Sequence, residues 1–492
     1  MFEAVELGHA VSKADYNAEV PKLREQLLDI QFELGDKKPF PVILIISGVD
    51  GAGKGETVNT LNFWMDPRNI HAHAMADPSD EELERPAMWR YWRKLPPRGS
   101  IGVFFGSWYS HPMRMHIDGG KSIDYLDSYL DDFLRFERML ADEGALILKF
   151  WLHLSKDDLK KRLSQLDKDK ATTWRVGKKE WDRYDRYDDL RPVAEHVLRR
   201  TSTGHAPWIV VESADEKYRN LTVAKTLLKA VKARLETGAK PIAASVPVQA
   251  LDHGDGINLL NTLDYSKSLD KKIYKEQLEH YQGRLNKLCR SKKFRNHSIV
   301  AVFEGNDAAG KGGSIRRVIG AMDSRMYNII PIAAPTDEEK AQPYLWRFWR
   351  HLPGRGKAVI FDRSWYGRVL VERVEGYCSQ ADWMRAYSEI NDFEEEMARH
   401  GIIVVKFWLS ITDEEQLARF KEREATGYKR FKLTDEDWRN RDKWDAYSSA
   451  VCDMVERTST EIAPWTVVEA NSKYYARIKV LKTLCKRLEA EL

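Results

Sequence analysis

The chain has 492 residues, of which 43% are hydrophobic and 31% charged, so a disordered, collagenous or low-complexity protein is excluded. The net charge is only +4, and any binding of polyanions must therefore come from local clusters of cations. Four widely spaced cysteines without a CxxC pair predict neither a disulfide framework nor a zinc site, which favours a reducing, cytoplasmic location. No apolar run approaches the roughly 18 residues of a membrane span, so we expect no membrane partner.

One sequence pattern occurs twice, at an offset of 257 residues. The letters WRYWR at 89–93 return as WRFWR at 346–350, together with many other matches at the same spacing. A period of this length is too long for a solenoid and indicates the duplication of a whole domain. We predict one domain at 1–237, a linker with scattered Gly, Pro, Ser and Ala at 238–262, and a second domain at 263–492.

Short apolar runs alternate with helical patterns in the second copy. Candidate strands are Ser298–Phe303, Asn328–Ala333, Ala358–Phe361, Ile402–Leu409 and Trp465–Glu469. Continuous apolar runs of this length are typical of parallel strands that are buried on both faces. The pattern predicts an α/β fold, three-layered and doubly wound, that occurs twice.

A glycine-rich turn follows the first of these strands and precedes a helical pattern from Gly312. Glycines let backbone N–H groups point at a phosphate, and the start of the following helix adds its positive dipole end. A similar turn, GVDGAGKG, begins at Gly48 in the first copy, and this recurrence favours a P-loop (Walker A) over a plain turn. The predicted phosphate-binding residues are Gly305, Ala309, Gly310, Lys311, Gly312, Gly313 and Ser314.

Both loops lack the hydroxyl that usually ligates Mg²⁺, because Gly312 and Gly55 follow the lysine. A hard cation then needs carboxylates. Asp307 lies inside the loop, and Asp362 ends the strand predicted at 358–361, a Walker-B-like position. Strand ends of a parallel sheet surround the ligand crevice, so we predict that Asp307 and Asp362 hold Mg²⁺. The alternative for Asp362 is an acid that caps a helix or a turn.

Arginines follow the second acid closely. Arg363 and Arg368 bracket the letters SWYG, Glu372 comes next, and Arg423 lies on a helix predicted to open at Thr412. Guanidinium groups bind phosphate through two parallel hydrogen bonds. For any single arginine the alternatives are a solvated surface or an ion pair, and we expect the Trp and Tyr of the motif to form core or pocket wall.

The segments EGNDAAGKGG, WRFWRHLPGRG and FDRSWYGR resemble the family-2 polyphosphate kinases. The duplicated arrangement is similar to the fused polyphosphate:AMP phosphotransferases. The resemblance implies two tandem P-loop kinase-like α/β/α domains with parallel sheets and helical lids, the second lid at about 412–447. It also implies Mg²⁺-dependent transfer of the terminal phosphate of inorganic polyphosphate to AMP, with GMP left open as an acceptor. The residues it marks as catalytic are Asp307, Lys311, Asp362, Arg363, Arg368, Glu372 and Arg423.

The two copies differ in the residues that carry this chemistry. The first copy keeps Asp50 and Lys54 but places Phe105, Gly106, His111, Met115 and Leu166 at the positions of Asp362, Arg363, Arg368, Glu372 and Arg423. A well-placed arginine in phosphoryl transfer is worth roughly 10³–10⁵ in rate. We therefore predict one working site, in the second copy. The first copy would serve as a packing partner or extend the basic track for polyphosphate.

Two other functions fit the sequence. An ATP-dependent nucleoside-monophosphate kinase uses the same loop, and a non-catalytic protein that binds nucleotides or polyanions would also need cations. The complete set of acids and arginines in the second copy favours an enzyme. No RNP, helix-turn-helix or zinc pattern is present, so we expect no nucleic-acid partner, and a homo-oligomer is left open.

Overall fold

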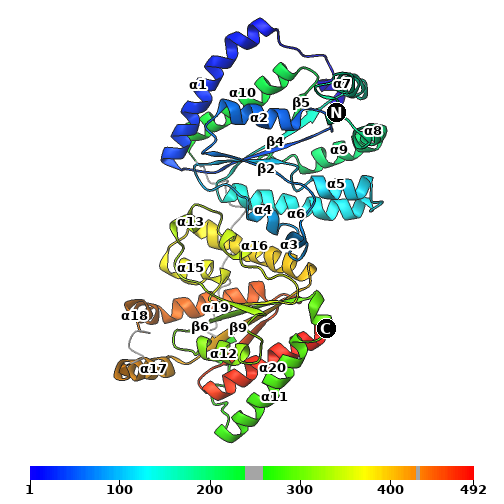
Figure 1. The fold of residues 1–492 in the computed structure, drawn as a ribbon. Helices are drawn as coiled ribbons and strands as arrows, with labels where there is room; N and C mark the ends of the chain where they lie inside the picture. Colours follow the sequence, from blue (N-terminus) through cyan, green and yellow to red (C-terminus); the bar gives the residue numbers. More distant parts are fainter. Residues whose placement is uncertain (239–258, 428–432) are drawn as a thin grey trace. The chain divides into compact units, whose positions relative to one another are not determined.

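The computed structural model describes residues 1–238, 259–427 and 433–492, which form two compact units with one parallel five-stranded sheet each (Figure 1). We call residues 1–238 the N-terminal repeat and 259–492 the C-terminal repeat. The predicted linker at 238–262 falls mostly outside the described residues, and its last four residues form the 3₁₀ helix η3 (Leu259–Thr262). Among the described residues, no helix is long and apolar enough to cross a membrane.

The N-terminal repeat alternates strands and helices along the chain. Its strands are β1 (Val42–Gly48), β2 (Ile70–Ala74), β3 (Ile101–Phe105), β4 (Leu146–His153) and β5 (Trp208–Glu212). Its helices are η1 (Phe2–Val5), α1 (Lys13–Lys37), α2 (Lys54–Trp64), α3 (Asp80–Leu83), α4 (Trp89–Trp92), α5 (Ser110–Ile117), α6 (Ile123–Asp142), α7 (Lys156–Lys168), η2 (Thr173–Arg175), α8 (Lys178–Asp185), α9 (Tyr187–Thr201) and α10 (Glu216–Thr237).

The C-terminal repeat follows the same order. Its strands are β6 (Ser298–Gly305), β7 (Tyr327–Pro331), β8 (Ala358–Asp362), β9 (Ile402–Ser410) and β10 (Trp465–Glu469), at the five predicted places. After η3 its helices are α11 (Lys271–Cys289), η4 (Lys293–Asn296), α12 (Lys311–Ile319), α13 (Asp337–Lys340), α14 (Trp346–Trp349), η5 (Trp365–Arg368), α15 (Val371–Glu375), α16 (Gln380–Arg399), α17 (Asp413–Ala425), α18 (Asp435–Asp442), α19 (Trp444–Thr458) and α20 (Lys473–Glu491).

Both sheets have the same topology, which confirms the predicted α/β class. The strand order is β2-β3-β1-β4-β5 in one repeat and β7-β8-β6-β9-β10 in the other, and the strands pair in parallel. The strand that precedes each glycine-rich loop is central, with later strands on both sides. Ligands of open parallel sheets bind outside the carboxyl ends of the strands, where the strand order reverses. In the C-terminal repeat this is the end of β6, between β8 and β9.

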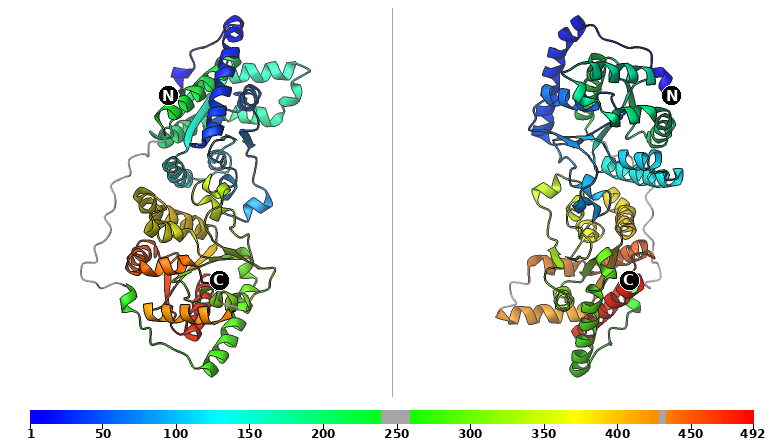
Figure 2. Two further views of the ribbon diagram at one scale, coloured as in Figure 1. Left: turned by 90° about the vertical axis from the view of Figure 1, so that its left-hand side faces the viewer. Right: turned by 45° about the vertical axis from the view of Figure 1, so that its right-hand side comes forward.

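A continuous apolar core holds this sheet edge in place. Alternate residues of β6, such as Ile299 and Phe303, share a cluster with Phe407 of β9 and with Val480 and Leu484 of α20. Helices α11 and α20 lie side by side, and α20 packs against β9 and β10 (Figure 2). Because β6 and the neighbouring strand β9 are buried along almost their whole length, the loop that leaves β6 starts from a fixed point.

One buried ion pair organises the residues around the SWYG motif. Lys406 on β9 and Glu394 on α16 are fully buried, and Nζ lies 2.7 Å from Oε2. The other carboxylate oxygen of Glu394 accepts hydrogen bonds from Trp365 Nε1 (3.1 Å) and Tyr366 Oη (2.7 Å). Both aromatic rings are buried, which confirms that they belong to the core. The N-terminal repeat has the same pair, Glu137 and Lys149.

Candidate active site

The glycine-rich loop leaves β6 at Gly305 and ends at Lys311, the first residue of α12. Gly305 has a φ of 148°, and a Cβ there would lie 2.4 Å from the carbonyl oxygen of Leu409 on β9. Gly310 caps α12 with a φ of 104°, in the left-handed region that glycine adopts without steric cost. The Lys311 ammonium donates to the Gly305 carbonyl at 2.7 Å. The sequence therefore fixes a tight loop with its lysine folded across it.

A cavity of about 630 Å³ opens beside this loop. It is lined by residues 307–313, by Asp362 at the end of β8 and Arg363 directly after it, and by residues of α17, α18 and α20. Its positively charged side chains are Lys311, Arg316, Arg363, Arg419, Arg423, Lys473 and Arg477. We call it the anion cavity, because seven cations around one loop suit a ligand with several phosphate groups.

A second cavity, of about 290 Å³, adjoins the first. Its wall includes the aromatic side chains Phe348, Trp408, Trp444 and Tyr447 together with aliphatic ones, and we call it the aromatic cavity. Residues that line both cavities are Asp307, Ile332, Arg363 and Glu436. One acid and one arginine predicted from the sequence therefore stand where the two cavities meet.

Asp307 and Arg363 contact each other at this junction. Arg363 Nη2 lies 3.2 Å from one carboxylate oxygen of Asp307, and the amide of Asn440 donates to the other at 2.9 Å. Burial alone would raise the pKa of Asp307, but the charges of Lys311 and Arg363 and the hydrogen bond from Asn440 bring it below its ordinary value. The acid is thus held as a carboxylate at neutral pH.

Arg363 has an unusual backbone. Its φ is 65°, in the left-handed region that costs a residue with a Cβ roughly 1–2 kcal/mol. Strain of this kind persists where the surroundings over-determine it, and it clusters at functional sites. Here the Arg363 N–H donates to the Phe303 carbonyl at 3.0 Å, and the next residue, Ser364, donates to Glu304 at 2.8 Å. Neighbouring bonds to β6 therefore hold the arginine at the junction.

The two acids predicted to hold a metal ion line the same cavity. Asp307 comes from the loop and Asp362 from the last position of β8. The described residues contain no group of three or more His, Cys, Asp or Glu side chains placed to hold a metal ion. Two carboxylates facing a space for phosphate suit Mg²⁺, which commonly binds through one or two carboxylates, water and substrate phosphate oxygens.

The other predicted site residues divide between the cavities. Ala309, Gly310, Gly312, Gly313 and Arg423 line the anion cavity, whereas Gly305 and Glu372 line the aromatic cavity. Arg368 and Ser314 line neither of these two cavities. Arg368 forms an ion pair with Glu372 at 2.9 Å, and Ser314 is buried in the first turn of α12. Arg368 is thus placed to orient Glu372, one layer behind the cavity wall.

Sequence reasoning missed two polar residues of the site. Glu304 precedes Gly305 and lines the aromatic cavity, 5% exposed. Burial raises its pKa, although Lys311 and Arg363 act in the opposite direction. Asn440, which binds Asp307, lies on α18. An acid directly before the glycine-rich loop was a visible signal, but nothing in the sequence around Asn440 marks it.

The segment predicted as a lid contributes helices to both cavities. It spans α17, α18 and the start of α19, and residues 428–432 within it lie outside the described residues. Arg419 on α17 is 4% exposed and donates to the Ala308 carbonyl of the loop at 2.9 Å. In this structure α17 is therefore tied directly to the glycine-rich loop.

The N-terminal repeat has a related cavity of about 390 Å³, lined by Asp50, Leu159, Arg183 and Tyr187 among others. The loop carboxylate in it is paired within the chain: Asp50 lies 2.9 Å from the Lys54 ammonium and 3.1 Å from Arg183. The positions of Asp362 and Arg363 are held by Phe105 and Gly106.

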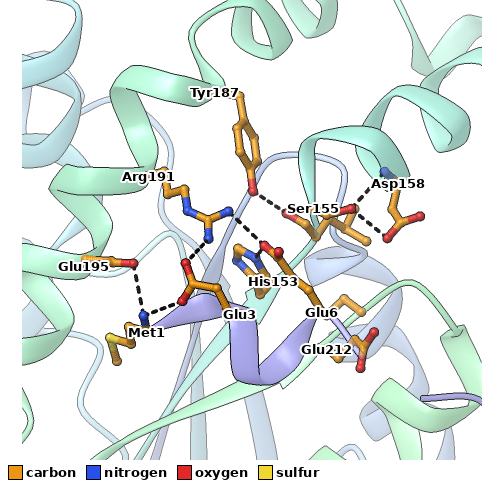
Figure 3. A network of polar contacts seen from close by, with 12 residues as sticks. Met1, Glu3, Glu6, His153, Ser155, Asp158, Tyr187, Arg191, Glu195 and Glu212 are labelled. Carbon is orange, nitrogen blue, oxygen red and sulfur yellow. Dashed lines mark hydrogen bonds and ion pairs between the residues drawn. The ribbon is translucent and has the colours of Figure 1, made fainter. Parts of the chain in front are cut away.

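A further charged network lies beyond the end of β4. There Glu6 accepts from Arg191 at 2.9 Å and contacts buried His153 at 2.7 Å, and Arg191 also contacts Glu3 at 2.8 Å (Figure 3). In these contacts two carboxylates of the chain neutralise the Arg191 guanidinium near this sheet edge.

The comparisons with known proteins cover the whole chain. The profile of the family Polyphosphate kinase 2 (PPK2) matches residues 10–238 and 268–492. The polyphosphate:AMP phosphotransferase of Pseudomonas aeruginosa is 58% identical over 490 residues, which cover 100% of this chain and 99% of the relative. That of Pseudomonas syringae pv. tomato is 52% identical, with 99% and 98% covered.

A solved structure points the same way. The crystal structure of a polyphosphate kinase 2 from Pseudomonas aeruginosa has a TM-score of 0.90 and 57% sequence identity, and covers 100% of this chain and 99% of that one. Sequence, topology and the loop geometry of both repeats agree with these matches. The chain belongs to the polyphosphate kinase 2 family.

Proposed function

We propose that this protein transfers the terminal phosphate of inorganic polyphosphate to AMP, giving ADP, and that the C-terminal repeat performs the reaction. The observation that supports the proposal is the pair of adjoining cavities, one cationic and one aromatic, with Asp307 and Arg363 at their junction. Two related proteins, 58% and 52% identical over essentially the whole chain, carry the name polyphosphate:AMP phosphotransferase.

The anion cavity is the proposed place of the donor. A chain of phosphates carries about one negative charge per unit and no apolar group, so it needs cations along its length. Lys311 on the loop, Arg423 on α17 and Arg477 on α20 surround the cavity from three elements. Such an arrangement can contact several phosphates at once, and its contacts do not depend on a nucleoside.

The aromatic cavity is the proposed place of the acceptor. A purine has two flat faces that pack on aromatic rings, and Trp444 and Tyr447 supply such rings. The phosphate of AMP would point toward Arg363, where the two cavities meet. The cavity volume of about 290 Å³ lies just below the range of roughly 300–1,000 Å³ that is usual for small-molecule sites.

In the proposed reaction an oxygen of the AMP phosphate attacks the terminal phosphorus of polyphosphate in line. The new P–O bond forms as the bridging P–O bond of the donor breaks, and the shortened chain leaves with the electron pair as an oxyanion. Such transition states need positioning and neutralisation of charge more than covalent help. Lys311 and the surrounding arginines would stabilise the leaving oxyanion, and Arg363 would orient acceptor and donor together.

Asp307 and Asp362 would hold Mg²⁺ at the donor side of the junction. The ion would supply positive charge to oxygens of donor and acceptor phosphates. Asp307 would have to release Arg363 or Asn440 in part to offer an oxygen, and the released partner would then contact substrate. The catalytic domain would be residues 263–492, joined to the first domain by a linker at 238–262. We also propose that the protein is cytoplasmic.

The proposal is tested by mixing purified protein, Mg²⁺ and AMP with either polyphosphate or ATP and following ADP. We expect ADP with polyphosphate and its loss in Asp362→Asn, because the variant removes a charge from the metal site but keeps its shape. ADP formed only from ATP would identify a nucleoside-monophosphate kinase instead. An unchanged rate in Asp362→Asn would contradict the assignment of the reaction to the C-terminal repeat.

A further inference from the structure

The first turn of the helix after the glycine-rich loop carries a carboxylate in the N-terminal repeat and a glycine in the C-terminal repeat. Helices α2 and α12 start at equivalent lysines, Lys54 and Lys311, and two residues later Glu56 occupies the position of Gly313. In the C-terminal repeat Gly313 lines the anion cavity. The start of a helix attracts negative charge, and in α2 the chain itself provides that charge.

Three arginines converge on the Glu56 carboxylate. Arg162 Nη2 and Arg219 Nη2 lie 2.6 Å and 3.3 Å from Oε2, and Arg175 Nη1 lies 3.4 Å from Oε1. They come from α7, α10 and η2. A carboxylate bound by guanidinium groups from three directions, at the start of the helix after a glycine-rich loop, has the surroundings of a bound phosphate.

Arg219 distinguishes this arrangement from a surface ion pair, because it is fully buried beneath the loop. It also donates to Thr57 Oγ1 at 2.9 Å, and a Cβ added to Gly53 would lie only 2.2 Å from its Nη1. The C-terminal repeat has Ala476 at the same position. A buried guanidinium needs an anion, so Arg219 and Glu56 depend on each other.

The lysine of this loop is also satisfied internally. Its ammonium donates to the carbonyls of Gly48 and Val49 at 2.9 Å and 3.0 Å and to Asp50 at 2.9 Å, which uses all three protons. Lys311 instead donates to two carbonyls, at 2.7 Å and 3.4 Å, and lines an open cavity. The Lys54 ammonium and the positive start of α2 are thus both neutralised by carboxylates of the same repeat.

We infer that the N-terminal repeat retains a phosphate site whose resident anion is the Glu56 carboxylate. While Glu56 is charged, this site binds no external phosphate or polyphosphate. Removing the carboxylate opens a site for inorganic phosphate chains between Arg162, Arg175 and Arg219. This site lies in the N-terminal repeat, outside the proposed active site, and the N-terminal repeat need not catalyse any reaction.

The test is hydrogen exchange of the full chain with and without tripolyphosphate, read separately in peptides that contain residues 48–60 and 305–318. In the unmodified protein we expect protection in 305–318 only. In Glu56→Gly, which gives α2 the glycine that α12 has, tripolyphosphate should also protect 48–60, at concentrations about ten to a hundred times below any that protect these residues in the parent. Glu56→Gln, which keeps the shape without the charge, should behave alike.

Glu33→Gln is the matched control, because it removes one carboxylate from an exposed pair in the same repeat and should leave residues 48–60 unprotected. Protection of 48–60 by tripolyphosphate in the unmodified protein would overturn the inference. The inference would also be overturned if tripolyphosphate left residues 48–60 unprotected in both Glu56 variants while their exchange without ligand showed a folded N-terminal repeat. Protection of 305–318 reports on the donor site of the proposed function, so the two ideas fail separately.

Discussion

The two repeats share a scaffold but differ in what faces the carboxyl edge of the sheet. Strand order, the buried Glu–Lys pair and the aromatic residues around it occur in both. The C-terminal loop opens on a cavity with seven cations, whereas the N-terminal loop is bound to carboxylates of its own repeat. In this chain the residues of the shared core are thus alike in the two repeats, whereas those facing the carboxyl edge of the sheet differ.

The backbone directly after β3 and after β8, the third strand of each repeat along the chain, shows this separation most clearly. Gly106 has a φ of 71° and Arg363 a φ of 65°, so both repeats need the left-handed conformation at this turn. The N-terminal repeat meets the need with glycine. The C-terminal repeat accepts the strain, and it gains a guanidinium at the junction of two cavities.

The largest expected effect comes from Arg363→Gly, which gives the C-terminal repeat the residue of its partner. We expect the rate of ADP formation to fall roughly 10³–10⁵-fold, because the group between donor and acceptor is lost. The free energy of unfolding should stay within about 1 kcal/mol, since relief of strain offsets the flexibility of glycine. Steady-state kinetics and urea unfolding of the same preparation measure both, and a parallel loss of stability would contradict a role at the junction.

The reverse change, Gly106→Ala, tests whether the N-terminal repeat tolerates a side chain at the same turn. A Cβ there would lie 2.8 Å from the Met75 carbonyl oxygen, so the N-terminal repeat should lose about 2 kcal/mol or more of stability. Activity at the C-terminal site should change less than twofold. Urea unfolding and the ADP assay test the pair of expectations, and an equally active but fully stable variant would show that the turn tolerates side chains in both repeats.

The buried ion pairs should behave alike in the two repeats. Lys406→Met leaves Glu394 buried without its counter-charge, and Lys149→Met does the same to Glu137. We expect each change to lower the free energy of unfolding of its repeat by about 3–5 kcal/mol. Denaturant titration followed by hydrogen exchange of peptides assigns each loss to a repeat. A much smaller loss in one of them would mean that this pair is not part of a shared scaffold.

Acid should loosen the N-terminal repeat more than the C-terminal one. Burial lowers the pKa of His73 to about 4 and also lowers the pKa of His111, His153 and His205, whereas only His400 shows such a shift among the described residues of the other repeat. The unfolded chain then binds protons first as the pH falls below 6.5, so stability is lost from there down through the folded pKa values.

The expected loss is about 1–2 kcal/mol between pH 6.5 and 4. Hydrogen exchange at pH 6.5 and 5, corrected for the intrinsic rate, reads the opening of each repeat separately. His153→Asn should reduce the effect, because it removes one buried imidazole. Equal opening of both repeats at pH 5 would contradict the expected difference in acid sensitivity.

Much of this architecture could be predicted from the sequence. Apolar runs such as 402–409 are long enough to indicate buried parallel strands, and the spacing of glycines and lysine in 305–314 is typical of a phosphate-binding loop. The ends of the strands depend on more than hydrophobicity. The strand predicted at Asn328–Ala333 is β7, which runs from Tyr327 to Pro331, because pairing with β8 sets its limits. Asp362 and Arg363 were predictable because the end of a strand places them at the crevice.

Long-range partners could not be predicted in the same way. Nothing near Asn440 in the sequence indicates that its amide meets Asp307, since the contact depends on how α18 packs. The contacts of Glu56 with Arg162 and Arg219, on which its proposed role rests, likewise join residues more than 100 positions apart in the sequence. Arg368 lies behind Glu372 rather than in the cavity wall, which a linear motif cannot distinguish.

The central claim is that one of two similar loops works, and a matched pair of lysine variants tests it most directly. Lys311→Ala and Lys54→Ala change equivalent residues, and the assay is ADP formation from AMP, polyphosphate and Mg²⁺. The account predicts a loss of at least about a hundredfold in Lys311→Ala and less than a twofold change in Lys54→Ala. Comparable losses in both variants, with both proteins folded, would contradict it.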